Sequence, residues 1–194
     1  MNRLISLTLL ALSAALSFAS GQELRKAPEL KFTLPGQGEH SLSELHGKVV
    51  SLEFILTTCP HCQAASRLLT TLQGEYGPRG FQALDLAING LDNNRTPEQA
   101  NELVLAFVRN FQVGFPVGWV PRDSFLSFLG FSIAEYTVVP QLVLIDRKGY
   151  IHYQTPARGD ENSTKETTIR QRIEELLASP QSAAARPTAR AHTR

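Results

Sequence analysis

The chain has 194 residues and nearly balanced charge, with 19 Lys and Arg against 18 Asp and Glu and a formal net charge of +1. Four of the basic residues, Arg3, Arg186, Arg190 and Arg194, lie near the two ends, so the middle of the chain is faintly acidic and a nucleic-acid partner is not expected. The only two cysteines are separated by two residues. They would close almost no loop, which excludes a disulfide-stapled scaffold.

The two ends differ in composition from a folded domain. Residues 1–19 combine an early basic residue, an apolar run and small residues around Ala19, which predicts a secretory signal peptide cleaved after Ala19. An uncleaved membrane anchor is the alternative. Residues 20–27 are expected to form a linker, and residues 179–194, rich in Ala, Pro and Arg without apolar periodicity, a disordered tail. The protein is therefore expected to be exported to the periplasm or another extracytoplasmic compartment, as a soluble or loosely membrane-associated protein.

Residues 28–178 remain, and they are enough for one domain with its own core. The expected strands are 30–34, 49–56, 81–88, a short edge strand at 115–117, 138–145 and 150–154. The expected helices are a short turn at 42–45, 60–74, 97–111, 123–129 and a last helix opened at Ser163, with capping-box spacing at Ser41–Glu44, Thr96–Gln99 and Ser163–Glu166. This order indicates a mixed sheet between layers of helices.

Both cysteines, Cys59 and Cys62, lie where the strand 49–56 gives way to a helix, with Pro60 and His61 between them. Proline is favourable at the first helical position, so Cys59 is expected at the helix N-terminus, where free amides and partial positive charge favour a thiolate. A redox pair is the preferred interpretation. A zinc half-site is one alternative, but structural zinc takes four ligands and no second pair follows; inert buried thiols are the other.

Two further polar residues stand out near this pair. Glu53 lies in an otherwise apolar run that predicts a buried strand, where an unpaired charge is costly and burial should raise the pKa of the carboxyl. The alternative is a strand-end residue turned to solvent. His61 lies between the cysteines and is expected to donate a hydrogen bond or positive charge to the Cys59 thiolate, with an exposed spacer as the alternative.

Three segments carry a resemblance to a known family: LSELHGKVV at 42–50, CPHC at 59–62 and VVPQLVLIDRKG at 138–149. With them, residues 28–177 resemble thioredoxin-fold proteins of the TlpA/ResA-like branch, exported thiol–disulfide oxidoreductases related to the AhpC/TSA redoxins. The Cys-Pro-His-Cys box itself is similar to that of the DsbA-type oxidases. The resemblance implies an α/β, thioredoxin-like three-layer sandwich, in which a mixed central sheet is flanked by helices and carries an extra N-terminal β-hairpin.

The same resemblance implies roles for individual residues. Cys59 would be the nucleophile and Cys62 the resolving cysteine, with a redox-active disulfide between them, and Glu53 would relay the proton of Cys62. It also implies a cis bond before Pro140, which would leave the Val139 backbone to bind an extended substrate segment as an added strand. An ordinary trans proline at a sheet edge is the alternative.

The function that these residues predict is exchange of disulfides with protein substrates, without a metal or cofactor. The expected partners are protein thiols and disulfides, such as an apocytochrome or a folding exported protein, together with an upstream redox partner. Reductase and oxidase directions are both left open. The alternatives are a copper chaperone that uses the cysteines with His152, and a peroxidase, although Leu56 and Leu52 stand where peroxiredoxins have threonine and proline.

Overall fold

Strand β4 (Val49–Ile55) consists of seven buried residues and lies in the middle of the sheet. The computed structural model describes residues 24–162 and 164–179. β4 pairs with β5 (Phe81–Ala87) in parallel and with β7 (Gln141–Ile145) in antiparallel orientation. A strand covered on both faces reads as a continuous apolar run, which explains the sequence pattern around Glu53.

Eight strands form one mixed sheet in the order β1-β8-β7-β4-β5-β6-β2-β3. The remaining strands are β1 (Arg25–Lys26), β2 (Lys31–Leu34), β3 (Gly38–Ser41), β6 (Val117–Trp119) and β8 (Tyr150–Gln154). The helices are α1 (Pro60–Tyr76), α2 (Pro97–Phe111), α3 (Arg122–Leu129) and α4 (Glu166–Ala178), with short 3-10 turns at Leu42–Leu45, Gly77–Arg79 and Asp92–Asn94.

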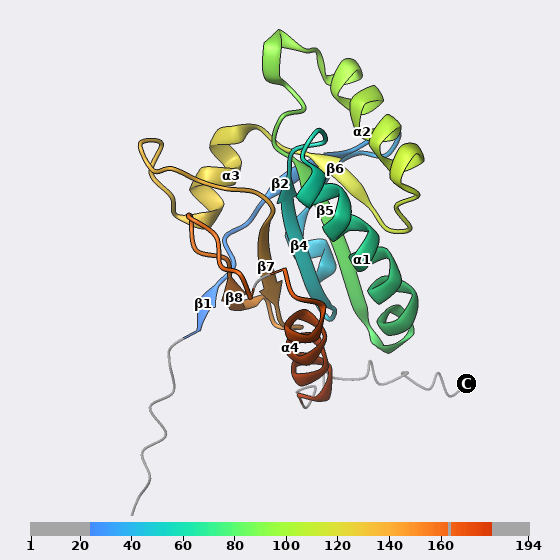
Figure 1. Ribbon diagram of the computed structural model, residues 1–194, viewed down its shortest axis with the longest axis vertical. Coiled ribbons are helices and arrows are strands. Elements are labelled where there is room, and N and C mark those ends of the chain that lie inside the picture. Colours follow the sequence, from blue (N-terminus) through green and yellow to red (C-terminus); the bar gives the residue numbers. More distant parts are fainter. Residues whose placement is uncertain (1–23, 163, 180–194) are drawn as a thin grey trace, which may run out of the picture.

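Helices cover both faces of this sheet (Figure 1). Buried side chains of α1, α2 and α4 pack in one core, which includes Ile55 of β4. Buried side chains of α3 and of the segment before β2 pack in a second core, which includes Phe54. Because neighbouring residues of β4 face different cores, the predicted three-layer α/β sandwich is confirmed.

The predicted N-terminal hairpin is also present, and because it pairs with β6, β6 is not an edge strand. β2 and β3 pair in antiparallel orientation, and β2 also pairs with β6 through Thr33 and Trp119. The prediction of an edge strand at 115–117 is therefore wrong, because the strand is β6, two residues later, and lies inside the sheet between β5 and β2. A Cβ on Gly118 would come within 2.5 Å of the Thr33 carbonyl oxygen, so this close pairing needs a glycine.

The helix ends differ in how well local signals predicted them. The Thr96 capping box is confirmed, since the Thr96 hydroxyl accepts a hydrogen bond from the Gln99 N–H (3.3 Å) and the Gln99 side chain accepts one from the Thr96 N–H (2.9 Å). The box expected to open the last helix is wrong: α4 has Lys165 as its N-cap, without a side-chain cap. Ser163 itself lies outside the described residues, as do the predicted signal peptide and residues 180–194 of the predicted tail.

Two smaller differences concern the segments next to these elements. Arg25 and Lys26, within the predicted linker, form β1 and pair with β8. α1 continues beyond Gly74 to Tyr76, because a glycine inside a helix weakens it without ending it.

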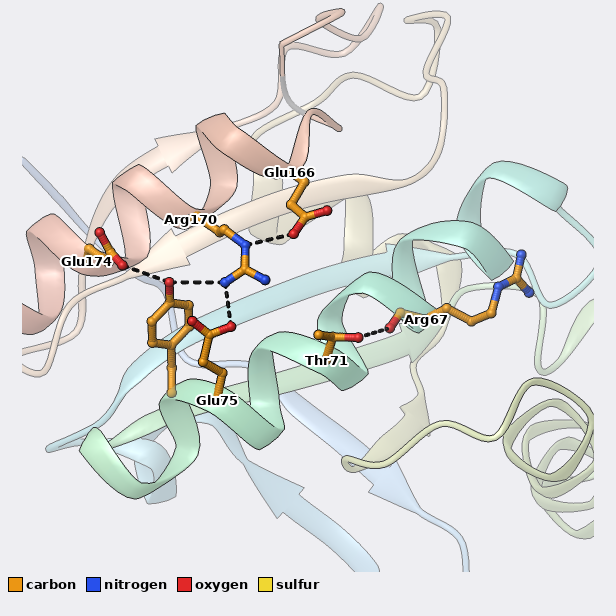
Figure 2. A network of polar contacts seen from close by, with 7 residues as sticks. Arg67, Thr71, Glu75, Glu166, Arg170 and Glu174 are labelled. Atoms are coloured by element: carbon orange, nitrogen blue, oxygen red, sulfur yellow. Dashed lines mark hydrogen bonds and ion pairs between the residues drawn. The ribbon is translucent and has the colours of Figure 1, made fainter.

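Tyr76 and Arg170 join the end of α1 to α4. Figure 2 shows Arg170 of α4 between Glu166 and Glu75. The Tyr76 hydroxyl donates to Glu174 (2.8 Å) and accepts from Arg170 (3.3 Å). The Arg170 guanidinium also binds Glu75 (2.5 Å) and Glu166 (2.7 Å). The ion pairs are exposed, whereas the Tyr76 ring is buried against Phe81, so the ring contributes more to stability than the charges do.

We expect Tyr76→Phe to lower the free energy of unfolding by about 1 kcal/mol, because it removes the hydroxyl and keeps the ring. Tyr76→Ala should cost roughly 3–5 kcal/mol through the cavity that it leaves. Urea unfolding monitored by circular dichroism gives both values. Arg170→Met is the control for the charges and should cost no more than about 1 kcal/mol; a larger loss in Arg170→Met than in Tyr76→Ala would contradict this ranking.

Candidate redox active site

Cys59 is the N-cap residue of α1, and Pro60 is the first residue of the helix. The backbone of Cys59 is extended (φ −82°, ψ 119°), and its Sγ accepts a hydrogen bond from the Cys62 N–H at 3.3 Å. Both cysteines are free thiols, and Cys59 is half-buried. The sulfur thus lies among the free amides of the first helical turn and remains within reach of a partner, as expected of an attacking thiolate.

Cys62, one turn further along α1, is fully buried. Burial, and next the hydrogen bond with the Cys59 thiol, raise the pKa of Cys62 well above the ordinary range of a thiol. Cys62 is therefore protonated at neutral pH and needs a base before it can attack a disulfide. The pair is asymmetric, with an accessible sulfur in front and a protonated, buried one behind it.

The turn between β4 and Cys59 is held by side chains from two other elements. The Asn89 side chain accepts a hydrogen bond from the Thr57 N–H (3.3 Å) and donates one to the Thr57 hydroxyl (3.0 Å). The Gln63 amide donates to the Thr57 carbonyl oxygen (3.2 Å). Asn89 was not among the expected site residues, although its position directly after the strand expected at 81–88 was an available signal.

A second loop lies against Cys59. The Val139–Pro140 peptide bond is cis, as the resemblance implied, and the Cys59 thiol donates to the Val139 carbonyl oxygen at 3.9 Å. β7 begins only at Gln141, so the strand expected at 138–145 is shorter than predicted, and Pro140 precedes it. No group among the described residues accepts a hydrogen bond from the Val139 N–H, which leaves this donor available to a substrate backbone.

Gln141 holds this loop in place, and the sequence analysis had not singled it out. Its side chain is fully buried and donates from Nε2 to the carbonyl oxygens of Val138 (2.8 Å) and Pro156 (3.2 Å). A glutamine directly after the proline, in an otherwise apolar strand, was the signal that could have identified it.

Glu53 is buried, with 2% of its surface exposed, so the alternative that it turns to solvent is wrong. It pairs in register with Asp85 of β5, which is completely buried. Burial, and next the charge of Asp85, raise the pKa of Glu53 well above its usual range. Burial likewise raises the pKa of Asp85, to about 7, against the opposing effect of a hydrogen bond from the Ser66 hydroxyl (2.5 Å). Glu53 also acts electrostatically on Cys62, raising the pKa of that thiol.

Sequence reasoning missed Asp85, although the signal was the same as for Glu53. Asp85 is a single carboxylate in the apolar run FQALDLAI at 81–88. Since β4 and β5 are parallel and in register, the two carboxylates come to the same face of the sheet, below α1.

His61 and His152, the two histidines to which the sequence analysis gave candidate roles, have no hydrogen bond to Cys59, Cys62 or Glu53 among the described residues. His61 is exposed in the first turn of α1, and no hydrogen bond joins it to either sulfur within the described residues, so its effect on Cys59 stays a prediction. His152 contacts Asp146 (2.9 Å). In residues 24–162 and 164–179, no group of three or more His, Cys, Asp or Glu side chains could hold a metal ion, and no helix is long and apolar enough to cross a membrane.

The mixed sheet, the helix that begins at a cysteine pair and the facing cis-proline loop define a thioredoxin-like fold. The AhpC/TSA family model matches residues 24–154, and the chain belongs to this family. A search of curated proteins found no match.

Solved structures with a similar fold come from several bacteria. A protein provisionally named a protein disulfide isomerase, from Bacteroides thetaiotaomicron, is 27% identical, with a TM-score of 0.61 over 79% of this chain and 88% of that one. A thioredoxin-family thiol:disulfide interchange protein from Chlorobium tepidum is 19% identical, with a TM-score of 0.61 over 79% of this chain and 97% of that one. Another from Chlorobium tepidum, provisionally named the thiol:disulfide interchange protein DsbE, is 24% identical, with a TM-score of 0.61 over 79% and 96%.

Proposed function

We propose that this protein is an exported thiol–disulfide oxidoreductase that exchanges disulfides with protein substrates through Cys59 and Cys62. The observation that carries the proposal is the asymmetry of the pair: Cys59 is half-buried at the N-terminus of α1, and Cys62 is buried behind it, next to Glu53. Export is supported by the sequence pattern of residues 1–19 alone.

The reaction proceeds through a mixed disulfide. In the reducing direction, the Cys59 thiolate attacks a substrate disulfide, forms a bond to one substrate sulfur and displaces the other as a thiolate. Cys62 then attacks Cys59; the bond between Cys59 and the substrate breaks, the second substrate sulfur leaves, and a Cys59–Cys62 disulfide remains. The substrate gains two electrons, and the cysteine pair loses two. The oxidising direction is the reverse, and the reduction potential of the pair relative to the substrate decides between them.

Glu53 is the proton acceptor for the second step. Cys62 must lose its proton to attack, yet it has no contact with bulk water because it is fully buried. Glu53 is buried two residues before Ile55 and therefore lies on the face of the sheet that α1 covers, and its charge raises the pKa of Cys62. The raised pKa of Glu53 is closer to the pKa of a thiol than that of an ordinary carboxyl group is. This suits Glu53 to accept the Cys62 proton in one direction of the reaction and to return it in the other.

The substrate binds as an extended segment along the cis-proline loop. The free Val139 N–H can donate to a substrate carbonyl oxygen. The carbonyl oxygen of Val139 lies 3.9 Å from the Cys59 sulfur. A backbone contact beside the reactive sulfur recognises extended chains rather than one sequence. A protein thiol or disulfide is therefore the substrate class, and a separate redox partner restores the pair after each turnover.

Membership of the AhpC/TSA family makes peroxide reduction a second candidate. Leu56 stands three residues before Cys59, where peroxiredoxins have a threonine. A leucine side chain cannot donate a hydrogen bond to a peroxide. The Cys62 thiol is hydrogen-bonded to the Cys59 thiol, which places it where it can attack a mixed disulfide at Cys59. The site therefore fits disulfide exchange better.

The first test is to trap the mixed disulfide. In Cys62→Ser, we expect Cys59 to form a stable disulfide with a protein substrate, because the residue that resolves it is missing. Incubation with oxidised insulin, alkylation and non-reducing electrophoresis with mass spectrometry would show a covalent adduct at Cys59.

Two controls accompany this experiment. The wild-type protein should show little adduct, since Cys62 resolves it, and Cys59→Ser should show none. Absence of any adduct in Cys62→Ser, together with rapid consumption of hydrogen peroxide by the wild-type protein, would reject the proposal in favour of the peroxidase.

A further inference from the structure

Asp85 and Glu53 form a pair of buried acids without a counter-ion. They are in register on parallel neighbouring strands, which lie about 4.8 Å apart, and their side chains are on the face covered by α1. Among the described residues, no lysine, arginine or histidine is buried. Two carboxylates at this spacing strongly disfavour simultaneous ionisation, because each charge is desolvated and repelled by the other.

One oxygen of each carboxyl group in the pair has no hydrogen-bond donor, so the two groups can share a proton. Asp85 Oδ2 accepts from the Ser66 hydroxyl, whereas Asp85 Oδ1 and Glu53 Oε2 are buried with no hydrogen-bond partner. A buried oxygen with no donor is costly unless it carries or accepts a proton. The two unpartnered oxygens belong to side chains that are paired in register on neighbouring strands, so each carboxyl is a candidate acceptor for a proton held by the other.

The pair is connected to the redox site from two sides. Glu53 acts electrostatically on Cys62. The Ser66 hydroxyl that binds Asp85 also contacts the Cys62 carbonyl oxygen (3.0 Å). The titratable side chains of the core on this face are Cys59, Cys62 and Tyr76 of α1 and Tyr153 of β8. The buried side chains that α2, α4, β6 and β7 contribute to this core are uncharged.

We propose that Glu53 and Asp85 hold one proton in common at neutral pH, and that Asp85 is a positioning residue which sets the proton affinity of Glu53. For its role in exchange, this proposal rests on the proposed function. When Cys62 attacks the mixed disulfide, the Cys62 proton moves to Glu53 and the proton of Glu53 moves to Asp85. The pair then carries two protons and no charge, a state that burial favours. One proton returns to Cys62 in the opposite direction.

Carbon-13 NMR of the side-chain carboxyl groups tests this directly. In the reduced wild-type protein, we expect the Glu53 and Asp85 signals to titrate in two shared steps, because the protons belong to the pair. In Asp85→Asn, Glu53 should titrate in one step, with its midpoint lower by about one pH unit or more, since the repelling charge is gone. Independent single-step titrations in the wild type, or an unchanged Glu53 midpoint in Asp85→Asn, would overturn the proposal.

The rate of the second exchange step supplies a readout that a merely structural role would not change. The pH at which this rate is half-maximal should shift in Asp85→Asn, whereas Asp123→Asn, an exposed acid at the start of α3, should leave it unchanged. An identical pH profile in Asp85→Asn and the wild type would also count against the proposal. If the wild type catalyses no exchange, the proposed function fails, while the NMR titration still decides whether the proton is shared.

Discussion

Cys59→Ser should reduce catalysed thiol–disulfide exchange to the uncatalysed background in both directions. A serine hydroxyl cannot form a disulfide, and Cys62 cannot replace Cys59, because it is buried and burial keeps it protonated. Insulin reduction by dithiothreitol measures one direction, and oxidation of a dithiol peptide by the disulfide form of the protein measures the other.

Thr58→Ser is the matched control for this experiment, since it changes an exposed side chain one residue before Cys59 and keeps both sulfurs. We expect near wild-type rates for it. If Cys59→Ser retained activity similar to that of Thr58→Ser, the nucleophile would be another group, and the assignment of the whole site would have to be abandoned.

The features that the sequence predicted well are those determined by neighbours along the chain. Pro60 after Cys59 indicated the start of α1, and Thr96 with Gln99 indicated the start of α2. Glu53 was recognisable because a carboxylate in a continuous apolar run has no solvent-exposed face to occupy. These are local rules, and they hold without knowledge of the other strands.

The features that were missed depend on contacts between distant segments. The strand around Gly118 was expected at an edge, because nothing near it indicates that β2, more than eighty residues earlier, pairs with it. Asp85 became significant only once β4 and β5 were in register, and Gln141 only once the loop at Val138 was in place. Such pairings are set by the total burial of apolar surface, which no short pattern encodes.

The α4 start shows a further way in which a local signal fails. Capping-box spacing predicted Ser163 as the N-cap of the last helix, but the observed N-cap is Lys165, two residues later. The helix is positioned by its buried residues Ile169, Ile173 and Leu176 against the core, and this packing outweighs a cap worth about 1 kcal/mol.

Glu53→Gln should slow exchange and at the same time stabilise the protein at alkaline pH. The activity loss follows from the missing proton acceptor and should be roughly 100-fold in the second step. The gain in stability follows from burial, because the pKa of Glu53 is raised in the folded protein and ordinary in the unfolded chain. Above the ordinary pKa of about 4.3, the unfolded chain releases this proton while the folded protein keeps it, so wild-type stability falls as the pH rises.

The glutamine variant carries no such proton and should escape this fall. We expect its free energy of unfolding to exceed that of the wild type at pH 8, and this difference to shrink towards zero near pH 4. Urea unfolding at the two pH values measures it, and Glu102→Gln, an exposed glutamate of α2, should change stability little at either. A difference that is the same at both pH values would show that Glu53 is not held protonated by burial. Burial of the Glu53 carboxyl without a counter-ion raises its pKa, and this raised pKa suits Glu53 to accept the proton of Cys62. The same burial lowers the free energy of unfolding at alkaline pH.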